Sequence, residues 1–196
     1  MISRGRNVPT TETIYRLMFE REKKKAYISF PMSHVMDLLD TLAEIERFKA
    51  TINEHFIVFD PADVDEFVLH MSALKAMQEG QTTMQVQAAD GPITLKTADV
   101  AQISGDILGQ IYARDFKMVD QSDMIISLVP ELPNGKPGLS SGVERELHHA
   151  FEGGKEVFVI WACRGNPSPF ITETATRVFR TTEEAIGYFR TKGYVK

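Results

Sequence analysis

The sequence predicts an α/β protein with a doubly wound sheet, in which parallel strands carry helices on both faces. Short apolar runs, such as EVFVIWAC at 156–163, alternate with helical patterns along most of the chain. Nearly every position in these runs is apolar, which is typical of strands that are buried on both faces. Because a helix lies between successive runs, each pair of strands forms a parallel crossover unit.

The first third of the chain supplies two helices and two strands. Apolar residues spaced three and four apart predict helices at 11–24 and 34–54. KAYISF (25–30) and HFIVFDP (55–61) are apolar runs that end next to a proline, which lacks the N–H that a strand ladder needs. We interpret both runs as buried strands.

Residues 62–105 interrupt this alternation. The stretch 63–78 could form a helix. TTMQVQAADGPITLKT (82–97) alternates on both sides of Asp90–Gly91, a pair that favours a tight turn, so we expect a β-hairpin inserted in the parent fold. A helix is expected next at 104–118, with three apolar side chains inward: Ile107, Ile111 and Met118.

The remaining sequence returns to alternating strands and helices. Ligands of such sheets bind beyond the carboxyl ends of the strands, so the loops that follow the strands are the candidate site. Thr181 and Glu184 have the spacing of a capping box at the start of the last helix. The expected order is strand 123–130, loop 131–139, helix 141–152, strand 156–163, loop 164–174, strand 176–180 and helix 181–193.

Length and composition are those of one globular domain. The 196 residues are 43% hydrophobic and 25% charged. We expect a single domain over 1–196, with an N-terminal extension at 1–24 and an insertion at about 66–103. The net charge of −5 and the pI of about 5.6 argue against a general nucleic-acid-binding surface, which is normally basic.

The sequence also favours a cytoplasmic protein without a membrane partner. Cys163 is the single cysteine, so no intramolecular disulfide can form, and a reducing compartment is expected. Residues 1–13 lack the apolar core of a signal peptide. No apolar run approaches the roughly 20 residues that a membrane-spanning helix needs.

Two glutamates near the start of the helix at 141–152 have different expected roles, because residues two apart face different ways. Ser141 followed by Glu144 predicts a capping box, which gives Glu144 a structural role. Glu146 lies too deep for that cap and one turn before the small Ala150. A carboxylate at this rim suits catalysis, and the alternative is a solvated side chain or a pair with His149.

The residues Ser140, Ser141 and Gly142 place hydroxyl and backbone N–H groups at the N-terminus of this helix. Such a terminus attracts anions, phosphate especially. A plain helix cap explains the same three residues equally well.

Asp115 is a second candidate carboxylate. It follows Arg114 near the expected end of its helix, where a negative charge opposes the helix dipole. That cost favours a functional role for Asp115. Asp120 and Asp123 flank the turn into the next strand, and for Asp120 we favour a surface charge.

Several common catalytic motifs are absent from the sequence. There is no G-x-x-x-x-G-K-[ST], and no G-x-G-x-x-G follows the first strand. His148 and His149 are adjacent but lack the further ligands that zinc needs, so we expect no metal and no cofactor. Cys163 ends an apolar strand without an obvious histidine partner, which favours a place in the core over a nucleophilic role.

Three stretches occur in an order that is known from one family. YISFPMS (27–33) matches a first strand and its loop, and RDFKMVDQSDMIISLVP (114–130) matches an Asp-led helix running into a strand. SSGVERELHHAFEGGKEVFVI (140–160) matches G-x-x-x-E-hydrophobic-x-x-A followed by G-K and a strand. Outside 1–24 and about 66–103, the chain thus resembles the nucleoside 2-deoxyribosyltransferase superfamily, including its nucleotide N-glycosidase branch. The resemblance implies a flavodoxin-like, five-stranded sheet.

The resemblance also implies residue roles. Glu146 falls where the family keeps its nucleophilic glutamate, and Asp115 where it keeps an aspartate that works at the base and sugar. Ser140 matches the branch that hydrolyses nucleoside 5′-monophosphates, whereas the free-nucleoside transferases tend to carry aspartate there. Phe30 replaces a loop glycine of the family, which narrows the approach to a ligand. The other expected substrate contacts are Ser141, Gly142, Pro31, Met32 and Arg114, with His34 as a further candidate.

The function expected from this resemblance is hydrolysis of the N-glycosidic bond of a nucleoside 5′-monophosphate, with Glu146 as nucleophile. One alternative is a deoxyribosyltransferase that exchanges bases between nucleosides. The other is a nucleotide-binding or sensing protein that kept the fold and lost turnover, which Phe30 favours. Family members form dimers or larger assemblies, so a homo-oligomer is implied.

Overall fold

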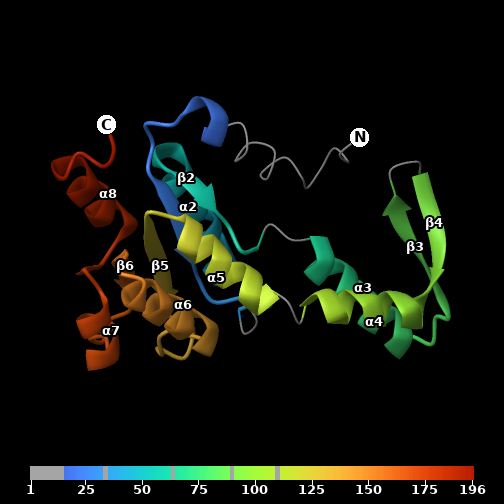
Figure 1. Cartoon of the computed structure of the whole chain (residues 1–196). Coiled ribbons are helices and arrows are strands. Elements are labelled where there is room, and N and C mark those ends of the chain that lie inside the picture. The colour runs from blue at the N-terminus through green and yellow to red at the C-terminus, as the bar shows by residue number, and fades with distance from the viewer. Residues whose placement is uncertain (1–15, 33–34, 63–64, 89–90, 109–110) are drawn as a thin grey trace. The chain divides into compact units, whose positions relative to one another are not determined.

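The apolar runs of the sequence form one parallel sheet. The computed structural model describes residues 16–32, 35–62, 65–88, 91–108 and 111–196. The strands pair in the order β2-β1-β5-β6-β7, and every pair is parallel (Figure 1). The strands are β1 (Lys25–Ser29), β2 (Ile57–Phe59), β5 (Met124–Pro130), β6 (Glu156–Ala162) and β7 (Arg177–Phe179).

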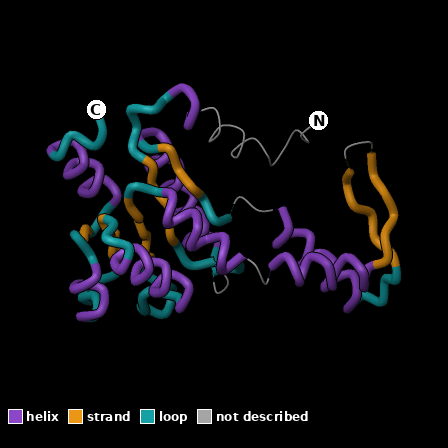
Figure 2. The backbone as a smooth tube through the Cα atoms, in the orientation of Figure 1, coloured by secondary structure: helices purple, strands orange, loops and turns teal. Residues whose placement is uncertain are grey.

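This strand order confirms the predicted doubly wound, flavodoxin-like fold. The chain moves outward from β1 to β2 and then returns to the other side of β1, so β1 and β5 flank a topological switch point. Helices lie on both sides of the strands (Figure 2). They are α2 (Leu39–His55), α5 (Ile111–Gln121), α6 (Ser141–Glu152), α7 (Pro169–Thr174) and α8 (Thr182–Thr191).

One face of the sheet packs against α5, α6 and α7. The stripe of α6 that faces the strands is Val143, Leu147 and Ala150, each at most 2% exposed. These side chains share a core with Val119 of α5 and Ile171 of α7. The sheet contributes six fully or almost fully buried residues to this core: Tyr27, Ile125, Val129, Val157, Val159 and Trp161.

The opposite face carries an aromatic core. The ring of Phe158 on β6 meets that of Phe189 on α8 edge-on, with ring centroids 4.9 Å apart. Phe56, which follows α2, packs edge-on against the same Phe189 ring at 5.3 Å. Such pairs add about 0.5–1.5 kcal/mol beyond the burial of their area.

Residues 62–115 form a separate compact unit, which we call the insertion unit; the remaining described residues form the α/β unit. The insertion unit contains α3 (Asp65–Gln78), the antiparallel hairpin of β3 (Thr83–Ala88) and β4 (Gly91–Lys96), and α4 (Thr97–Leu108). Its small core is Ala73, Val100 and Ala101, with Leu69, Met84 and Val86 packed against it.

The predicted inserted hairpin is therefore confirmed, and the helices α3 and α4 flank it in the sequence. The helix expected to start near Ser104 begins at Thr97, because Val100, Ala101 and Ser104 are buried and continue the helical stripe backward. A second helix, α5, begins at Ile111. The side chains of Ile107 and Ile111, expected inward, lie outside those described, whereas Met118 packs against the core.

Three other predicted boundaries are wrong. The helix expected at 34–54 begins at Leu39, because its buried stripe starts only at Thr41. Within the described part of 11–24, residues 16–19 alone are helical. The loop expected at 164–174 contains α7, whose first residue is Pro169, a residue that favours the first helical position. No described helix has the length and apolar character needed to cross a membrane.

Candidate active site

The carboxylate of Glu146 is held by two hydroxyl groups of β1. The phenol of Tyr27 donates a hydrogen bond to Glu146 Oε1 at 3.0 Å, and Ser29 Oγ donates to Glu146 Oε2 at 2.5 Å. Glu146 itself is half-buried, whereas Tyr27 and Ser29 are fully buried. The carboxylate is thus turned toward the strand that borders the switch point of the sheet.

The sequence places these donors by the two-residue period of a strand. Side chains two apart on a strand point to the same face, so Tyr27 and Ser29 both face α6. Glu146 lies between the buried Val143 and Leu147 of α6 and reaches the strand from the flank of the helix. Hydrogen bonds to a carboxylate from two O–H donors favour its charged form and fix its orientation.

Ser140, not Ser141, caps α6. The Ser140 side chain accepts a hydrogen bond from the Val143 N–H at 3.2 Å, and the first intrahelical bond runs from Glu144 N–H to the Ser140 carbonyl. The predicted capping box between Ser141 and Glu144 is therefore wrong by one residue. Glu144 is exposed and has no role in the cap.

The start of α6 retains donors for an anion. Ser141 and Gly142 are exposed, and their N–H groups precede the first intrahelical hydrogen bond. The O–H of Ser140 can still donate, because its oxygen is the atom that accepts from Val143. Six residues separate Ser140 from Glu146, which is about 9 Å along a helix axis.

A hollow of about 350 Å³ lies between α6 and α7. It occupies the flank of α6 that carries Ser141 and His148, and the exposed Phe170 of α7 contributes to its wall. Glu146 is on the other flank of α6, toward β1. The remaining lining residues are Glu144, Arg145, Leu147, Ile171 and Thr174.

His149 is not the partner of Glu146. Its Nε2 lies 2.8 Å from Asp120 Oδ1, and its ring stacks on Phe116 with centroids 4.5 Å apart. This pair links α6 to α5 at the surface of the α/β unit. Asp120 is thus an exposed charge with one partner.

Asp115 is a buried carboxylate paired with its neighbour. It is 8% exposed, and Arg114 donates to Asp115 Oδ1 through Nη2 at 2.8 Å and Nε at 3.1 Å. Burial raises the pKa of Asp115 above its ordinary value of 3.8, while Arg114 opposes that rise. Asp115 lies in the middle of α5, so the expected conflict with a helix C-terminus does not exist.

The loop after β1 shows three of the predicted contact residues. Phe30 is 7% exposed and lies under the ammonium group of Lys49 of α2, 5.6 Å from the ring centre. Its ring thus faces α2, whereas Ser29 faces α6. Pro31 is buried and Met32 is half-buried, and His34 lies outside the described residues.

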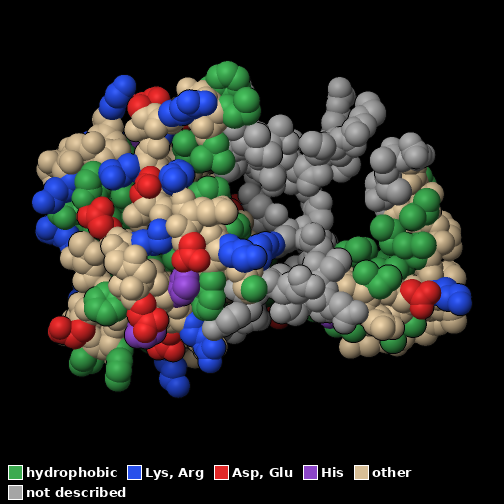
Figure 3. Space-filling model, in the orientation of Figure 1, with side chains coloured by type: hydrophobic (Ala, Val, Ile, Leu, Met, Phe, Trp, Pro, Cys, Tyr) green, Lys and Arg blue, Asp and Glu red, His purple; other side chains and the backbone are tan. Residues whose placement is uncertain are grey.

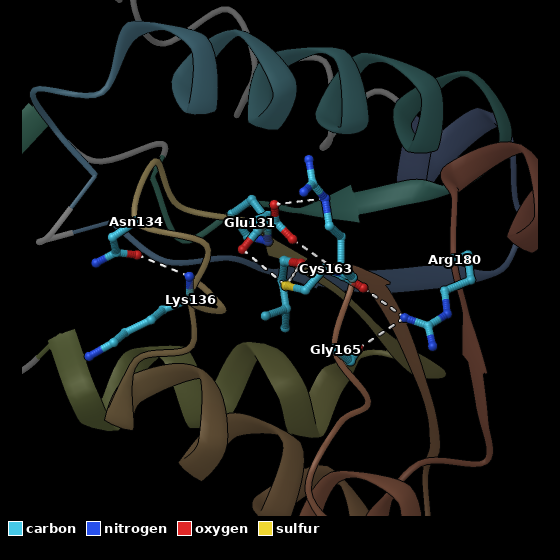
Figure 4. Close-up of polar contacts among 9 residues, drawn as sticks. Glu131, Asn134, Lys136, Cys163, Gly165 and Arg180 are labelled. Carbon is cyan, nitrogen blue, oxygen red and sulfur yellow. Dashed lines mark hydrogen bonds and ion pairs between the residues drawn. The ribbon is translucent and has the colours of Figure 1, made fainter.

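A larger hollow of about 690 Å³ lies on the α2 and α8 face, beyond the ends of β5 and β6. At its rim, Arg180 donates to the carbonyls of Cys163 at 2.7 Å and Gly165 at 3.1 Å (Figure 4). Glu131 accepts from the Arg164 N–H at 2.8 Å. At this rim, Arg180 and the Arg164 N–H thus each have a partner.

The Cys163 thiol in this hollow is not activated. It is 5% exposed and donates to the carbonyls of Val129 and Pro130 at 3.5 and 3.4 Å. Burial, with a contribution from Glu131, raises the pKa of Cys163 to about 11. A thiol with that pKa is protonated at neutral pH and is a poor nucleophile.

Candidate metal ligands are dispersed over the described residues. Within the described ranges, no group of three His, Cys, Asp or Glu side chains is placed to hold a metal. On the face of the α/β unit that Figure 3 presents, acidic and basic side chains are interspersed. Glu146 differs from these dispersed groups in that two hydroxyl donors hold its carboxylate.

The sequence interpretation missed Tyr27 and Ser29 as parts of the site. Both are polar residues within an otherwise apolar strand, and a buried hydroxyl needs a hydrogen-bond partner. Their spacing of two residues signals one shared face. That signal predicts a polar group opposite β1, which Glu146 supplies.

Comparison with known proteins finds a structural likeness. No protein-family model and no curated protein matches the chain. Among solved structures, it is similar to the 2-deoxyribosyltransferase of the psychrotolerant bacterium Bacillus psychrosaccharolyticus, with 14% sequence identity and a TM-score of 0.48. The match covers 88% of this chain and 97% of that one. At this identity, residue roles are not transferred between the two chains.

Proposed function

We propose that the chain hydrolyses the N-glycosidic bond of a nucleoside 5′-monophosphate, with Glu146 as the nucleophile. The observation that carries the proposal is the Glu146 carboxylate, which accepts hydrogen bonds from Tyr27 and Ser29 at the switch point of the sheet. Ligands of doubly wound sheets bind at that point. The resemblance of residues 140–160 to the glycosidase motif supports the same choice.

The chemistry requires a carboxylate of this kind. Loss of the base builds positive charge at C1′ and the ring oxygen of the sugar. A carboxylate below C1′ stabilises that charge and can bond to C1′, and water then hydrolyses the resulting ester. Tyr27 and Ser29 prepare the carboxylate for this step because they fix both of its oxygens before the substrate arrives.

The 5′-phosphate would bind at the start of α6. The Ser140 hydroxyl and the N–H groups of Ser141 and Gly142 are the proposed donors there. Serine at position 140 favours a monophosphate over a free nucleoside, because an aspartate there would repel the phosphate.

Asp115 is proposed as the second catalytic carboxylate. Its raised pKa keeps a larger fraction of the carboxyl protonated, which suits a group that donates a proton to the leaving base. Arg114 holds one oxygen of Asp115 and thereby orients it. Pro31 and Met32 are proposed to shape the base end of the site, whereas the ring of Phe30, also expected there, faces α2.

A substrate screen tests the proposed function. The chain is incubated with ribo- and deoxyribonucleoside 5′-monophosphates and with the free nucleosides, and free base is measured by chromatography. We expect base release from a monophosphate and little from the matching nucleoside. Base exchange between unphosphorylated nucleosides would instead identify a transferase. Binding of a monophosphate by calorimetry without base release would identify a sensing protein.

We further propose that the active form is a cytoplasmic homo-oligomer. Light scattering of the purified chain tests the assembly, and a monomer that retains full activity contradicts it.

A further inference from the structure

Ser127 is a buried hydroxyl without a hydrogen-bond partner. It lies on β5, it is fully buried, and its Oγ contacts no donor or acceptor among the described residues. Such groups are rare in folded proteins, because a buried polar atom that has lost its water and gained no partner is unfavourable. An exception at a candidate active site calls for a functional explanation.

The sheet register places this hydroxyl beside the group that holds Glu146. Ser127 is the residue on β5 that pairs with Ser29 on β1. Side chains of paired residues on neighbouring parallel strands lie on the same face, and the strands are about 4.8 Å apart. Ile125 and Val129, which share this face of β5, belong to the core under α6. Ser127 therefore points into the same layer as Ser29 and Glu146.

We propose that Ser127 is the substitute acceptor for the Ser29 hydroxyl when Glu146 attacks the sugar. In the resting chain, Ser29 donates to Glu146 Oε2. When Oε2 bonds to C1′, that oxygen loses most of its capacity to accept, and Ser29 needs another acceptor. Ser127 is paired with Ser29 on the neighbouring strand, and its Oγ has no hydrogen-bond partner among the described residues. The inference rests on the proposed function and deepens it, because it assigns Oε2 as the attacking atom.

The step balances without any further reactant. The C1′–Oε2 bond forms as the bond from C1′ to the base nitrogen breaks, and the electron pair of that bond passes to the nitrogen. The base nitrogen takes a proton from Asp115, the proposed acid, or from water. The hydrogen of Ser29 stays on Ser29 and only its hydrogen bond changes, from Glu146 Oε2 to Ser127 Oγ.

This arrangement accelerates the reaction because the hydrogen bond from Ser29 to Ser127 forms only as Glu146 Oε2 bonds to C1′. Interactions that are stronger in the transition state than in the ground state raise kcat, whereas those equal in both do not. The unpaired hydroxyl of Ser127 destabilises the resting state, and pairing relieves that cost as the bond to C1′ forms. Ser127 is a positioning residue, since it acts through Ser29 and is buried away from substrate.

The test compares kinetics and stability in Ser127→Ala. We expect kcat to fall about tenfold with KM unchanged, because one hydrogen bond to a neutral group is lost in the transition state alone. The melting temperature should stay equal or rise, since an unsatisfied hydroxyl is removed. Ser127→Cys keeps an atom of similar size that accepts weakly, so its kcat should lie between those of wild type and Ser127→Ala.

A matched control and a double-mutant cycle separate this role from a structural one. Thr97 is the other described buried hydroxyl without a partner, and it lies in the insertion unit. Thr97→Val should resemble Ser127→Ala in stability and leave kcat unchanged. In a Ser29→Ala background, Ser127→Ala should have no further effect, because the donor is already gone.

Three outcomes overturn the proposal. An unchanged kcat in Ser127→Ala, or additive losses in the double variant, contradicts the role of Ser127 as substitute acceptor. Base release by the wild type would then still support the proposed function. A lower melting temperature together with a raised KM assigns Ser127 to packing. A wild-type chain that releases no base from any nucleotide removes both the proposed function and this inference.

Discussion

The two faces of the sheet each present polar groups near the carboxyl ends of the strands, but they differ in how those groups are paired. The hollow on the α2 and α8 face is the larger, at about 690 Å³, and its rim arginine Arg180 is bound to backbone carbonyls. On the α6 face, the carboxylate of Glu146 accepts from two hydroxyls, and a third hydroxyl stands unpaired nearby. The face with the larger hollow thus has its rim arginine paired, whereas the α6 face retains a buried hydroxyl without a partner among the described residues.

The same contrast holds for the two possible nucleophiles. Glu146 is half-buried and is held by donors that favour its anionic form. Cys163 is buried among carbonyl acceptors, and burial raises the pKa of its thiol to about 11. The Glu146 carboxylate thus has hydroxyl donors, whereas the Cys163 thiol is protonated at neutral pH. Three substitutions and one labelling experiment test this contrast.

The largest expected effect is that of Glu146→Gln. An amide cannot form the glycosyl ester at a useful rate, so base release should fall by roughly 10⁴- to 10⁶-fold, the range for loss of a single catalytic residue. Glu144→Gln, an exposed glutamate on the same helix, is the matched control and should leave the rate unchanged. Chromatography of free base measures both variants. Equal rates for Glu146→Gln and wild type would exclude Glu146 as the nucleophile.

The second effect concerns the Cys163 thiol. A pKa of about 11 instead of the usual 8.5 lowers the thiolate fraction at neutral pH by about 300-fold, so alkylation by iodoacetamide should be slower in the native chain by at least that factor. The urea-unfolded chain is the control, and Cys163→Ala should retain full base release. Fast labelling of the native chain at pH 7 would contradict the inert state.

The third effect is that of Asp115→Asn, with an expected loss of about 100-fold in kcat at neutral pH if Asp115 protonates the base.

Burial raises the pKa of Asp115, so the native chain holds this proton more tightly than the unfolded chain does. The free energy of unfolding therefore decreases as pH rises from the ordinary pKa of 3.8 through the raised one.

Asp115→Asn should remove that slope, which urea unfolding between pH 3.5 and 7 would measure. Asp37→Asn, at an exposed position, is the control and should retain the wild-type slope. If the free energy of unfolding changes with pH equally in the wild-type chain and in Asp115→Asn, burial of this carboxyl has no energetic consequence.

The smallest effect is that of Tyr27→Phe, which removes the hydroxyl that donates to Glu146 Oε1 and leaves the rest of a fully buried side chain unchanged. We expect about a tenfold fall in kcat, because a hydrogen bond to a charged group is lost. Tyr194→Phe is the control, since it removes a hydrogen bond to Glu156 of 2.6 Å elsewhere in the chain. If both variants retain the wild-type rate, Tyr27 has a structural role alone.

The sequence predicts an element most closely where its apolar stripe, its capping residues and its flanking loops all indicate the same bounds. For α6, the Pro/Gly loop, the serines at its start, the stripe of Val143, Leu147 and Ala150 and the glycines after it all indicate 141–152, and the structure has Ser141–Glu152. The cap itself differs by one residue, because two adjacent serines offer the same side chain. Local signals fix the element and leave its exact cap open.

The insertion unit shows where sequence reasoning is weaker. Its core depends on Ala73 and Ala101, small residues whose burial comes from the close approach of α3 and α4 and not from any apolar stripe of their own. The same limit applies to the site. Glu146 could be selected from its motif, but the link from Tyr27 and Ser29 to Glu146 spans more than 115 residues and depends on the strand order. Pairing over that distance is decided by tertiary packing.

Direct detection of a sugar on Glu146 tests the central claim most sharply. Wild-type chain mixed with a monophosphate that the screen identifies as a substrate is quenched in mild acid during the first turnover, and trypsin then releases residues 146–155. Mass spectrometry should find the sugar phosphate on Glu146 of this peptide, and Glu146→Gln should show none. Rapid base release with residues 146–155 unmodified, or with the sugar on another residue, would contradict the assignment of Glu146 as the nucleophile.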